Sequence, residues 1–408
     1  MKKIAIVHFT IYPVIGGVEV VIDQHARLLA DKGYDVEIFC AEGKQFDKRV
    51  KVTIVPEIDV RAEENMKIRT ALEKENKVVR EFDLLSEKVY RKFRQLLAGK
   101  DFCILHNIQS NQLHIPGAAA FRKLAEELDC RFIAWCHDHV LTTPYYADKS
   151  RDKYPWSIIG EKDKNMQYVV VSETQQKKLS KLFGVPEKEL KVVPNGVPIK
   201  GFLTNNETIY RIFEKYGLFS EKLVMLMPSR VVPRKNIEYG IKLLAEIRKK
   251  LGYGKVVLTG RAHAQRPELE KYYHDLKDMA KKLGLEKYFI FLSEIRVNGR
   301  ELYIDDEMIR DLFYACDMLL FPSKQEGFGI PLLEAAMVRM PAVVSNIDVH
   351  VGLGIDHIFI DIAKEPREHV DKIAEFCENN TIIRNRKFVL NTYSWDSIYE
   401  NTMKHLFE

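Results

Sequence analysis

The hydrophobic positions of the chain form short β-branched runs, and between these runs apolar residues recur at helical spacing. Six runs in the first half fit buried parallel strands, at residues 4–9, 36–40, 102–106, 132–137, 168–171 and 190–193. Six more follow, at residues 223–227, 255–259, 288–292, 318–321, 342–345 and 358–360. Strand–helix alternation is typical of doubly wound parallel sheets. Two such series therefore predict an α/β protein with two Rossmann-like domains.

The junction between the two series gives the expected domain boundary. Pro, Gly and Asn cluster between residues 194 and 205, which indicates a hinge. We therefore expect a first domain over residues 1–198 and a second domain from residue 199. The highly charged stretch at residues 63–100 predicts one or two solvated helices packed on the first domain.

Length and charge are those of an ordinary globular protein with more than one domain. The 408 residues exceed a single core of usual size, which predicts two or three domains. The net charge of +5 arises from 63 basic and 58 acidic residues, so we expect no nucleic-acid partner. The six cysteines include no C-x-x-C pair, and several fall in apolar runs, as expected of reduced thiols in a reducing compartment.

Two further features bear on localisation. The apolar run at the N-terminus is broken by His8, Pro13 and Gly16, and no cleavage site follows, so it does not fit a signal peptide. No apolar run reaches the roughly 18 residues that a membrane-spanning helix needs. We therefore expect a cytoplasmic protein, unless it attaches peripherally to a membrane. A basic–aromatic cluster at residues 88–94 is compatible with an anionic membrane, but its acidic neighbours favour a plain solvated helix.

The most informative motif contains two glutamates, Glu326 and Glu334, separated by seven residues. A strand at 318–321 leads into a glycine-containing turn, and the turn opens a helix at about Ile330. The start of a helix offers unpaired N–H groups to a phosphate, whereas carboxylates repel phosphate and accept hydrogen bonds from sugar and ribose hydroxyls. The combination predicts a ligand with both phosphate and sugar. Ordinary solvated glutamates are the alternative, and the sequence Gly327-Phe328-Gly329 between the two favours a ligand site.

Two cations, Arg230 and Lys235, lie between a predicted strand and a helix that begins near Asn236. A nucleotide diphosphate develops negative charge as its bond to a sugar breaks, and fixed cations beside a helix start stabilise that charge. A basic surface loop is the alternative, and it becomes less favoured beside the glutamate pair.

Histidines at a strand end form a third motif. His137 and His139 are expected on one face of the strand, as metal ligands or as partners of sugar hydroxyls. No HExxH motif, cysteine pair or Asp-x-Asp pair would complete a metal site, so we expect no metal. A neutral His137 can bind a sugar hydroxyl, and Asp138 can orient an acceptor hydroxyl. Gly16-Gly17 either brings N–H groups to a phosphate or forms a simple turn, and it lacks the G-x-G-x-x-G pattern of nicotinamide enzymes.

All these motifs follow predicted strands. In open parallel sheets, ligands bind outside the carboxyl ends of the strands, and with two such domains the default site is the cleft between them.

Taken together, the motifs resemble the retaining, nucleotide-sugar-dependent glycosyltransferases of family 4, which have the GT-B fold, with two Rossmann-like domains facing across a cleft. The resemblance covers nearly the whole chain, and it is carried by residues 16–19, His137, residues 193–197, 229–235, 326–334 and 393–395. It implies that residues 388–408 form a C-terminal helix that crosses back to the first domain, so that the second domain covers residues 199–387.

The resemblance also implies roles for individual residues. Glu334 would bind the ribose, Glu326 the donor sugar, and Arg230 and Lys235 the diphosphate. His137 would contact the donor sugar from the opposite domain. The remaining donor-binding positions would be Gly17, Asn195, Phe328, Gly329 and Ile330. The nucleotide diphosphate sugar would be the donor substrate, and no cofactor would be required.

The acceptor side is expected in the first domain. The polar and basic stretch after residue 137 favours a small anionic acceptor, with its expected contacts at Asp138, His139, Lys149, Arg151 and Tyr154. Finer motifs, at residues 134–138, 154–156, 234–238 and 328–331, resemble a smaller group that includes enzymes similar to mannosylglucosylglycerate synthase. This resemblance implies GDP-mannose or UDP-glucose as donor and glucosylglycerate as acceptor. The alternatives are a lipid- or polysaccharide-directed transferase, a nucleotide-sugar 2-epimerase, or a sugar-nucleotide binder without turnover.

Overall fold

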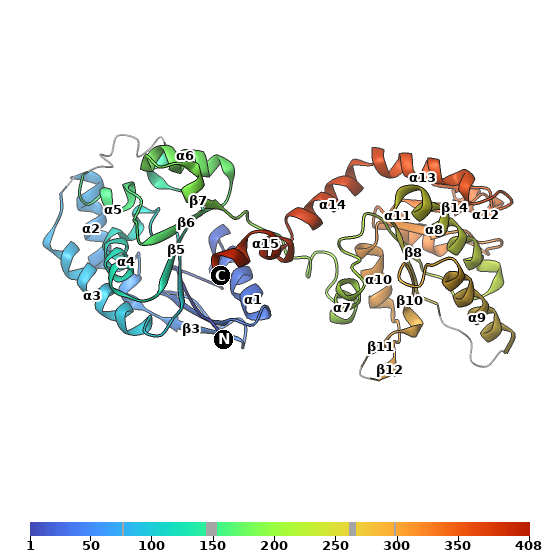
Figure 1. The fold of residues 1–408 in the computed structure, drawn as a ribbon, viewed down its shortest axis with the longest axis horizontal. Coiled ribbons are helices and arrows are strands. Elements are labelled where there is room, and N and C mark those ends of the chain that lie inside the picture. Colours follow the sequence, from blue (N-terminus) through green and yellow to red (C-terminus); the bar gives the residue numbers. More distant parts are fainter. Residues whose placement is uncertain (76, 144–152, 261–266, 298) are drawn as a thin grey trace. The chain divides into compact units, whose positions relative to one another are not determined.

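The computed structural model describes residues 1–75, 77–143, 153–260, 267–297 and 299–408. The chain forms two compact units (Figure 1). Unit 1 comprises Met1–Val197 together with Trp395–Glu408, and unit 2 comprises Pro198–Ser394. The chain therefore enters unit 2 after Val197 and returns to unit 1 at Trp395. The helix that covers the expected start of the C-terminal segment, α14 (Thr381–Thr392), belongs to unit 2.

Unit 1 contains a seven-stranded parallel sheet with the order β3-β2-β1-β4-β5-β6-β7. Its strands are β1 (Lys3–Val7), β2 (Asp35–Cys40), β3 (Val50–Ile54), β4 (Phe102–His106), β5 (Arg131–Cys136), β6 (Met166–Val170) and β7 (Leu190–Val192). The six strands expected from the sequence are present, and β3 is an additional edge strand that pairs with β2.

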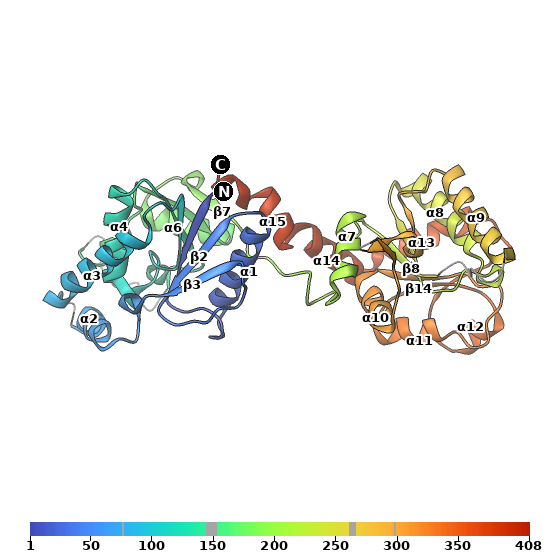
Figure 2. The same cartoon turned by 90° about the horizontal axis from the view of Figure 1, so that it is seen from below.

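Alternating side chains of the strands supply two apolar faces, and helices cover both (Figure 2). One face carries Ile4 and Ile6 and is covered by α1 (Gly17–Asp31) and by the C-terminal α15 (Trp395–Asn401). The other face carries Ala5 and Val7. Its covering helices are α2 (Glu63–Lys74), α3 (Arg80–Leu96), α4 (Ile115–Glu127), α5 (Ser157–Gly160) and α6 (Glu173–Phe183).

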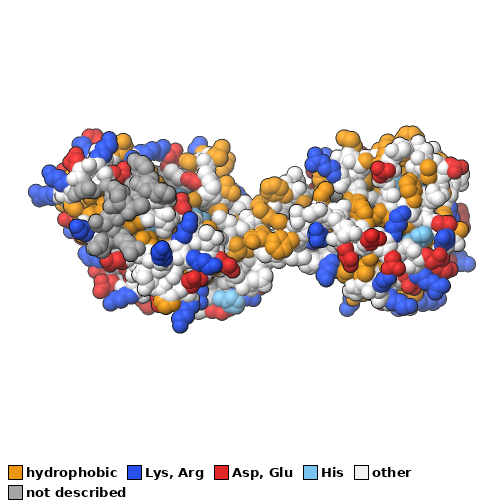
Figure 3. Space-filling view, turned by 90° about the horizontal axis from the view of Figure 1, so that it is seen from above, with side chains coloured by type: hydrophobic (Ala, Val, Ile, Leu, Met, Phe, Trp, Pro, Cys, Tyr) orange, Lys and Arg blue, Asp and Glu red, His pale blue; other side chains and the backbone are white. Residues whose placement is uncertain are grey.

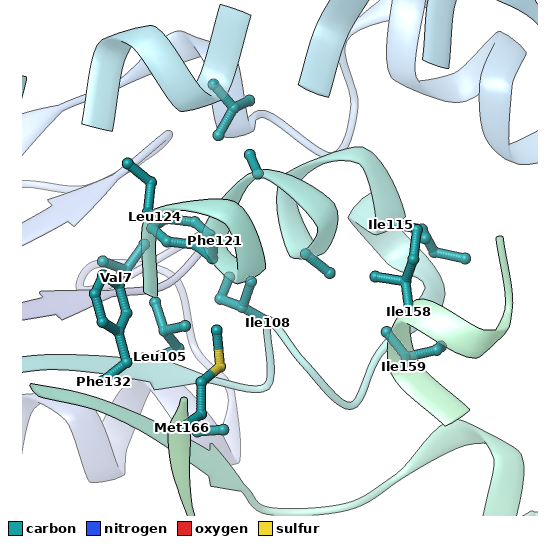
Figure 4. Close-up of a cluster of buried hydrophobic side chains, with 14 of the residues drawn as sticks. Val7, Leu105, Ile108, Ile115, Phe121, Leu124, Phe132, Ile158, Ile159 and Met166 are labelled. Carbon is teal, nitrogen blue, oxygen red and sulfur yellow. The ribbon is translucent and has the colours of Figure 1, made fainter. Parts of the chain in front are cut away.

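Figure 4 shows buried apolar side chains in the core between this second face and its helices. Phe121 and Leu124 of α4 lie over Leu105 of β4 and Phe132 of β5. The charged stretch at residues 63–100 forms two helices, α2 and α3. The apolar residues of α3 recur three or four positions apart, so a single stripe is buried while the charged residues remain in solvent (Phe82, Leu85, Val89 and Phe93).

Unit 2 contains a six-stranded parallel sheet with the order β10-β9-β8-β13-β14-β15. Its strands are β8 (Val224–Met227), β9 (Lys255–Leu258), β10 (Phe289–Phe291), β13 (Met318–Phe321), β14 (Ala342–Ser345) and β15 (Ile358–Ile360). A small antiparallel pair, β11 (Arg296–Val297) and β12 (Arg300–Glu301), follows β10. Every main strand expected for the second domain is present.

Helices also cover both faces of the unit 2 sheet. Met318 and Leu320 face the side of α8 (Ile237–Leu251), α9 (Pro267–Lys282) and α13 (Arg367–Asn379). Leu319 and Phe321 face the side of α7 (Glu207–Lys215), α10 (Asp306–Ala315) and α11 (Ile330–Met337). The short helix α12 (Asp348–Gly352) follows β14. Both units are thus Rossmann-like. This confirms the predicted α/β fold class, in which a GT-B protein has two Rossmann-like domains.

The strand order reverses at one place in each sheet, between β1 and β4 in unit 1 and between β8 and β13 in unit 2. The connections that leave these neighbouring strands diverge to opposite faces, and ligands bind in the crevice that results. Ligand-binding sites are therefore expected at the loops after β1, β4, β8 and β13.

The surface and the thiols agree with the composition. Basic and acidic side chains are interspersed on the face of each unit drawn in Figure 3. All six cysteines are buried and free, as expected. Among the described residues, no helix combines the length and apolar character that crossing a membrane would require.

Candidate functional site

In unit 2, an ion-paired cluster joins the loops that follow β8 and β13. Lys235 Nζ lies 2.6 Å from Glu326 Oε1, and Arg234 Nη1 lies 3.2 Å from Glu326 Oε2. Arg234 also donates to the carbonyl of Gln325 at 3.1 Å. The Lys235 ammonium lies 4.8 Å from the ring centroid of Phe321, so the last residue of β13 supports it. The two motifs singled out in the sequence thus meet directly at the switch point of the sheet.

The cluster keeps Glu326 ionised. Burial alone would raise the pKa of this carboxyl, because only 8 % of its side chain is exposed, but the Lys235 hydrogen bond and the charges of Lys235 and Arg234 lower the pKa below its usual value. Arg234, which sequence reasoning passed over in favour of Arg230, is the arginine that reaches Glu326. Arg230 is exposed and has no ion-pair partner in the described part of the chain.

The helix after the glutamate turn begins at Ile330, as predicted. Gly329 precedes it with φ 97°, a left-handed conformation that favours glycine, and no side chain caps the helix. In the first turn, Pro331 has no N–H and the Leu332 N–H donates to the Gly329 carbonyl at 2.9 Å, so the Ile330 N–H remains available to an anion. Phe328 and Ile330 flank this helix start and are 57 % and 60 % exposed. Glu334 lies one turn into the helix, where partial burial and the nearby Asp306 charge raise its pKa.

In unit 1, residues at the end of β4 make hydrogen bonds that fix the residues following β5. His106 Nδ1 lies 2.9 Å from His137 Nε2. The neighbouring Asn107 accepts a hydrogen bond from the His137 N–H at 2.9 Å and donates to Asp138 Oδ1 at 2.9 Å. Asn107 has φ 54°, so its backbone turns sharply just beyond the strand. Both His137 and Asp138 are thus fixed from the adjacent strand.

The His137 ring is neutral at pH 7. Burial, followed by the effect of His8, lowers its pKa to about 4. His8 comes from the end of β1, and its Nδ1 donates to the carbonyl of His106 at 2.8 Å. The ends of β1, β4 and β5 are therefore linked by imidazole rings at the unit 1 switch point.

His139 does not share the position of His137, and the expected common face is wrong. The ring of His139 is 1 % exposed; its Nε2 donates to the carbonyl of Ile159 at 2.8 Å, and its Nδ1 accepts from the N–H of Leu141 at 3.3 Å. The physical reason is that β5 ends at Cys136, so strand alternation does not extend over these residues. Both ring nitrogens of His139 are used inside the protein, which contradicts its expected acceptor contact.

The other expected site residues are dispersed over unit 1. Tyr154 is 55 % exposed, and its hydroxyl donates to Asp83 Oδ1 of α3 at 3.2 Å. Asn195 is exposed. Gly17 is the first residue of α1, and a β-carbon on the preceding Gly16 would lie 2.1 Å from a carboxylate oxygen of Glu19. Lys149 and Arg151 lie outside the described residues.

Two other groups of residues bear on metal binding and on membrane binding. In the described part of the chain, no group of three or more His, Cys, Asp or Glu residues could hold a metal ion. In the basic–aromatic cluster on α3, Phe93 is fully buried, and Tyr90 lies under Lys123 at 3.8 Å from the ring centroid. Arg91 pairs with Glu87 at 2.7 Å. These contacts are those of a solvated helix.

Comparison with known proteins adds two family matches. Residues 15–200 match the family model Glycosyltransferase Family 4, and residues 209–395 match Glycosyl transferases group 1. An uncharacterized glycosyltransferase of Methanocaldococcus jannaschii is 25% identical over 63% of this chain and 64% of its own length. The mannosylglucosylglycerate synthase of Petrotoga mobilis is 25% identical over 68% of this chain and 66% of its own. The alignments thus span slightly less than two thirds of these relatives.

Among solved structures, sucrose-phosphate synthase from Thermosynechococcus elongatus aligns with a TM-score of 0.40 and 14% identity, over 100% of this chain and 98% of that one. The two family matches contain the Glu326 cluster of unit 2 and His137 of unit 1. The chain belongs to the glycosyltransferases, with a Glycosyltransferase Family 4 part followed by a Glycosyl transferases group 1 part.

Proposed function

We propose that the protein is a retaining glycosyltransferase that moves a hexose from a nucleotide diphosphate sugar to a hydroxyl of a small polar acceptor. The observation that carries the proposal is the cluster of Lys235, Arg234 and Glu326 beside the uncapped start of α11. Cations and the free Ile330 N–H suit a diphosphate, and ionised carboxylates suit the hydroxyls attached to it.

In the proposed donor site, the diphosphate lies at the start of α11, near Phe328 and Gly329. Lys235 and Arg230 stabilise the negative charge that develops on the leaving diphosphate. Glu334 binds the ribose, and Glu326 binds hydroxyls of the donor sugar. The lowered pKa of Glu326 favours this role, because an ionised carboxylate accepts hydrogen bonds from two hydroxyls at once.

The proposed reaction exchanges one bond for another at the anomeric carbon. The bond from this carbon to the diphosphate oxygen breaks, and a bond to the acceptor oxygen forms on the same face. The acceptor proton passes to an oxygen of the departing diphosphate, so no side-chain base is needed. Lys235, Arg230 and the Ile330 N–H take the place that a metal ion would otherwise have, and we propose that transfer does not depend on metal.

For the acceptor, we propose a small anionic compound, with glucosylglycerate as the specific candidate. The distant similarity to mannosylglucosylglycerate synthases supports this choice. The proposed acceptor contacts in unit 1 are Asp138, Tyr154, Lys149 and Arg151, and His139 is withdrawn from the set because its ring is fully engaged. GDP-mannose and UDP-glucose are the proposed donors.

A donor–acceptor panel tests the proposal. GDP-mannose and UDP-glucose are each offered with glucosylglycerate, glycerate, neutral sugars and a detergent-solubilised lipid acceptor, and products are identified by mass spectrometry. NMR of the product gives the anomeric configuration, and a parallel series contains EDTA. We expect transfer to the anionic acceptor with retention, undiminished by EDTA.

The other outcomes each remove one part of the proposal. Transfer to the lipid alone would contradict the small acceptor, and equal use of a neutral sugar would remove the proposed role of Lys149 and Arg151. Free nucleotide diphosphate and an epimerised sugar without an acceptor product would identify an epimerase. Loss of activity with EDTA, restored by Mg²⁺, would contradict metal independence.

A further inference from the structure

The contact between His106 and His137 has a consequence for what His137 can offer to a substrate. His106 Nδ1 and His137 Nε2 are 2.9 Å apart, so a single proton lies between them. Both rings are buried beside other histidines and are neutral at pH 7: burial lowers the pKa of His106 well below its ordinary value and that of His137 to about 4. One ring therefore donates and the other accepts. Which ring donates decides whether Nδ1 of His137 carries a proton or a lone pair.

The surroundings of His106 favour one arrangement. His106 is fully buried, and its Nε2 has no hydrogen-bond partner among the described residues. Its neighbours are aromatic rings, His25 at 5.3 Å and Trp135 at 5.6 Å between centroids. A buried N–H beside π-electrons gains a weak hydrogen bond, whereas a buried lone pair in the same place gains none. The proton of His106 is therefore better placed on Nε2, which leaves Nδ1 as the acceptor.

The intrinsic chemistry of imidazole points the same way. A neutral histidine side chain prefers the tautomer with its proton on Nε2. If His137 donates from Nε2 to His106 Nδ1, both rings have this preferred tautomer. If His106 donates instead, both rings must adopt the less favoured one. The first arrangement is thus favoured at both residues.

We propose that His106 is a positioning residue that fixes His137 with its proton on Nε2, so that His137 presents the Nδ1 lone pair to a substrate hydroxyl. The link to substrate rests on the proposed function, but the tautomer itself does not. His137 is partly exposed, so its free nitrogen can meet a ligand. A hydroxyl that binds to Nδ1 must donate the hydrogen bond. This position therefore selects substrate groups that are hydrogen-bond donors.

The tautomer is measured directly in the ligand-free full-length protein. Nitrogen-15 histidine labelling, with assignment by the His137→Gln variant, gives the protonation state of each ring nitrogen at neutral pH. We expect a protonated Nε2 and an unprotonated Nδ1 for His137. Protonation of His137 at Nδ1 would overturn the proposal, whether or not the protein is active. This measurement does not depend on the folding of the His106 variants below.

Variants test whether His106 acts through His137. His106→Leu removes the acceptor, whereas His106→Asn can keep an acceptor oxygen close to the position of Nδ1. We expect His106→Leu to lower kcat about tenfold, the loss of roughly one hydrogen bond, and to mix the two tautomers of His137. His106→Asn should restore most of both. If His106→Leu folds and leaves the His137 tautomer unmixed, the proposal fails.

A double-mutant cycle and a matched control complete the test. In the His137→Ala background, His106→Leu should have little further effect on kcat, because the two residues act as one unit. Independent, multiplicative losses would overturn the positioning role. His114→Asn is the control: His114 is also buried in unit 1, but its Nδ1 accepts from the Gly117 N–H at 2.9 Å and serves α4. The tautomer is measured without any activity assay. Failure of the proposed function can therefore be distinguished from failure of the tautomer proposal.

Discussion

The two units share one sheet topology, but they build opposite electrical environments at the strand ends. In unit 1, the switch point is filled by neutral rings, His8, His106 and His137, linked through hydrogen bonds of 2.8 and 2.9 Å. In unit 2, the corresponding place holds charges, with Glu326 between Lys235 and Arg234. The same backbone framework therefore accommodates either kind of group.

The difference suits two kinds of ligand group. A diphosphate needs fixed cations, whereas a hydroxyl is bound either by a neutral ring or by an ionised carboxylate such as Glu326. It also gives the units different responses to acid and to loss of single charges. The predictions below use these responses, from the largest expected effect to the smallest.

Acid should separate the two units. In unit 1, burial lowers the pKa of His25 to about 3 and of His114, His137 and His139 to about 4, from an ordinary value of 6.5. Between pH 6.5 and about 4, the unfolded chain therefore binds more protons than the folded chain, so stability falls as the pH falls. Each such histidine costs about 1.4 kcal/mol per pH unit in this window.

The three tryptophans, Trp135, Trp156 and Trp395, all belong to unit 1, so their fluorescence reports on this unit alone. We expect it to change at a higher pH than hydrogen exchange in unit 2 peptides. His25→Phe should move the unit 1 midpoint to lower pH, because it removes a fully buried histidine whose ring nitrogens have no hydrogen-bond partner among the described residues. His405→Gln removes an exposed histidine of the same unit and serves as the control. Simultaneous loss of both units would refute the comparison.

Removal of one buried charge should damage unit 2. The Asp317 side chain is fully buried; it accepts from the Val224 N–H at 2.8 Å and pairs with Lys387 Nζ at 2.7 Å and Arg386 Nη1 at 3.5 Å. Asp317→Ala would leave the buried Lys387 ammonium without its carboxylate, while Arg386 keeps its bonds to backbone carbonyls, at a cost of about 3–5 kcal/mol in the free energy of unfolding. Denaturant titration followed by hydrogen exchange measures this cost. Asp371→Ala, which breaks an exposed pair with Lys250, should change stability by less than about 0.5 kcal/mol. Equal effects would show that burial does not govern the charges of this unit.

The cations near the glutamate turn should affect turnover more than binding. Lys235→Ala and Arg230→Ala should each lower kcat by on the order of 100-fold, because they act on charge that grows in the transition state. Donor affinity should fall less. Lys324→Ala is the control, since this exposed lysine pairs with Glu238 of α8 at 2.7 Å. Steady-state kinetics with the best donor of the panel decide, and a raised KM with unchanged kcat would restrict the cations to binding.

The two glutamates should separate in calorimetry with the bare nucleotide diphosphate. Glu334→Ala should weaken binding by about tenfold, the loss of roughly one charged hydrogen bond to the ribose. Glu326→Ala should leave this affinity nearly intact and depress transfer, because its proposed partner is the sugar. Equal losses of nucleotide affinity in both variants would undo the assignment.

Much of the fold followed from the sequence, since continuous apolar runs mark buried parallel strands. The strand β3 was missed because Val50–Ile54 alternates with polar residues and pairs on one side only, at the sheet edge. The ends of strands were predictable to within a few residues, and this small error mattered at His139, where strand alternation was extended too far.

Side-chain partners could not be predicted in the same way. Lys235 and Glu326 are 91 positions apart, and their contact depends on two loops that adjacent strands bring together. The choice of Arg234 over Arg230 depends on the tight turn at residues 233–235 and on the left-handed Asn236, with φ 54°. No spacing rule in the sequence distinguishes these two arginines.

The return of the chain to unit 1 at Trp395 has a consequence for synthesis on the ribosome. Trp395, Ile398, Met403 and Phe407 cover one face of a sheet whose first strand is made of residues 3–7. The part of that face that α1 does not cover stays exposed until residues 395–408 have emerged, while unit 2 is continuous in sequence and can close earlier. Unit 1 is thus the first to begin and the last to be completed. Until then, its exposed apolar surface is a binding site for chaperones. Pulse proteolysis of nascent chains that carry a linker after residue 394, halted once that residue has left the ribosome, would reveal that order as resistance in unit 2 before unit 1.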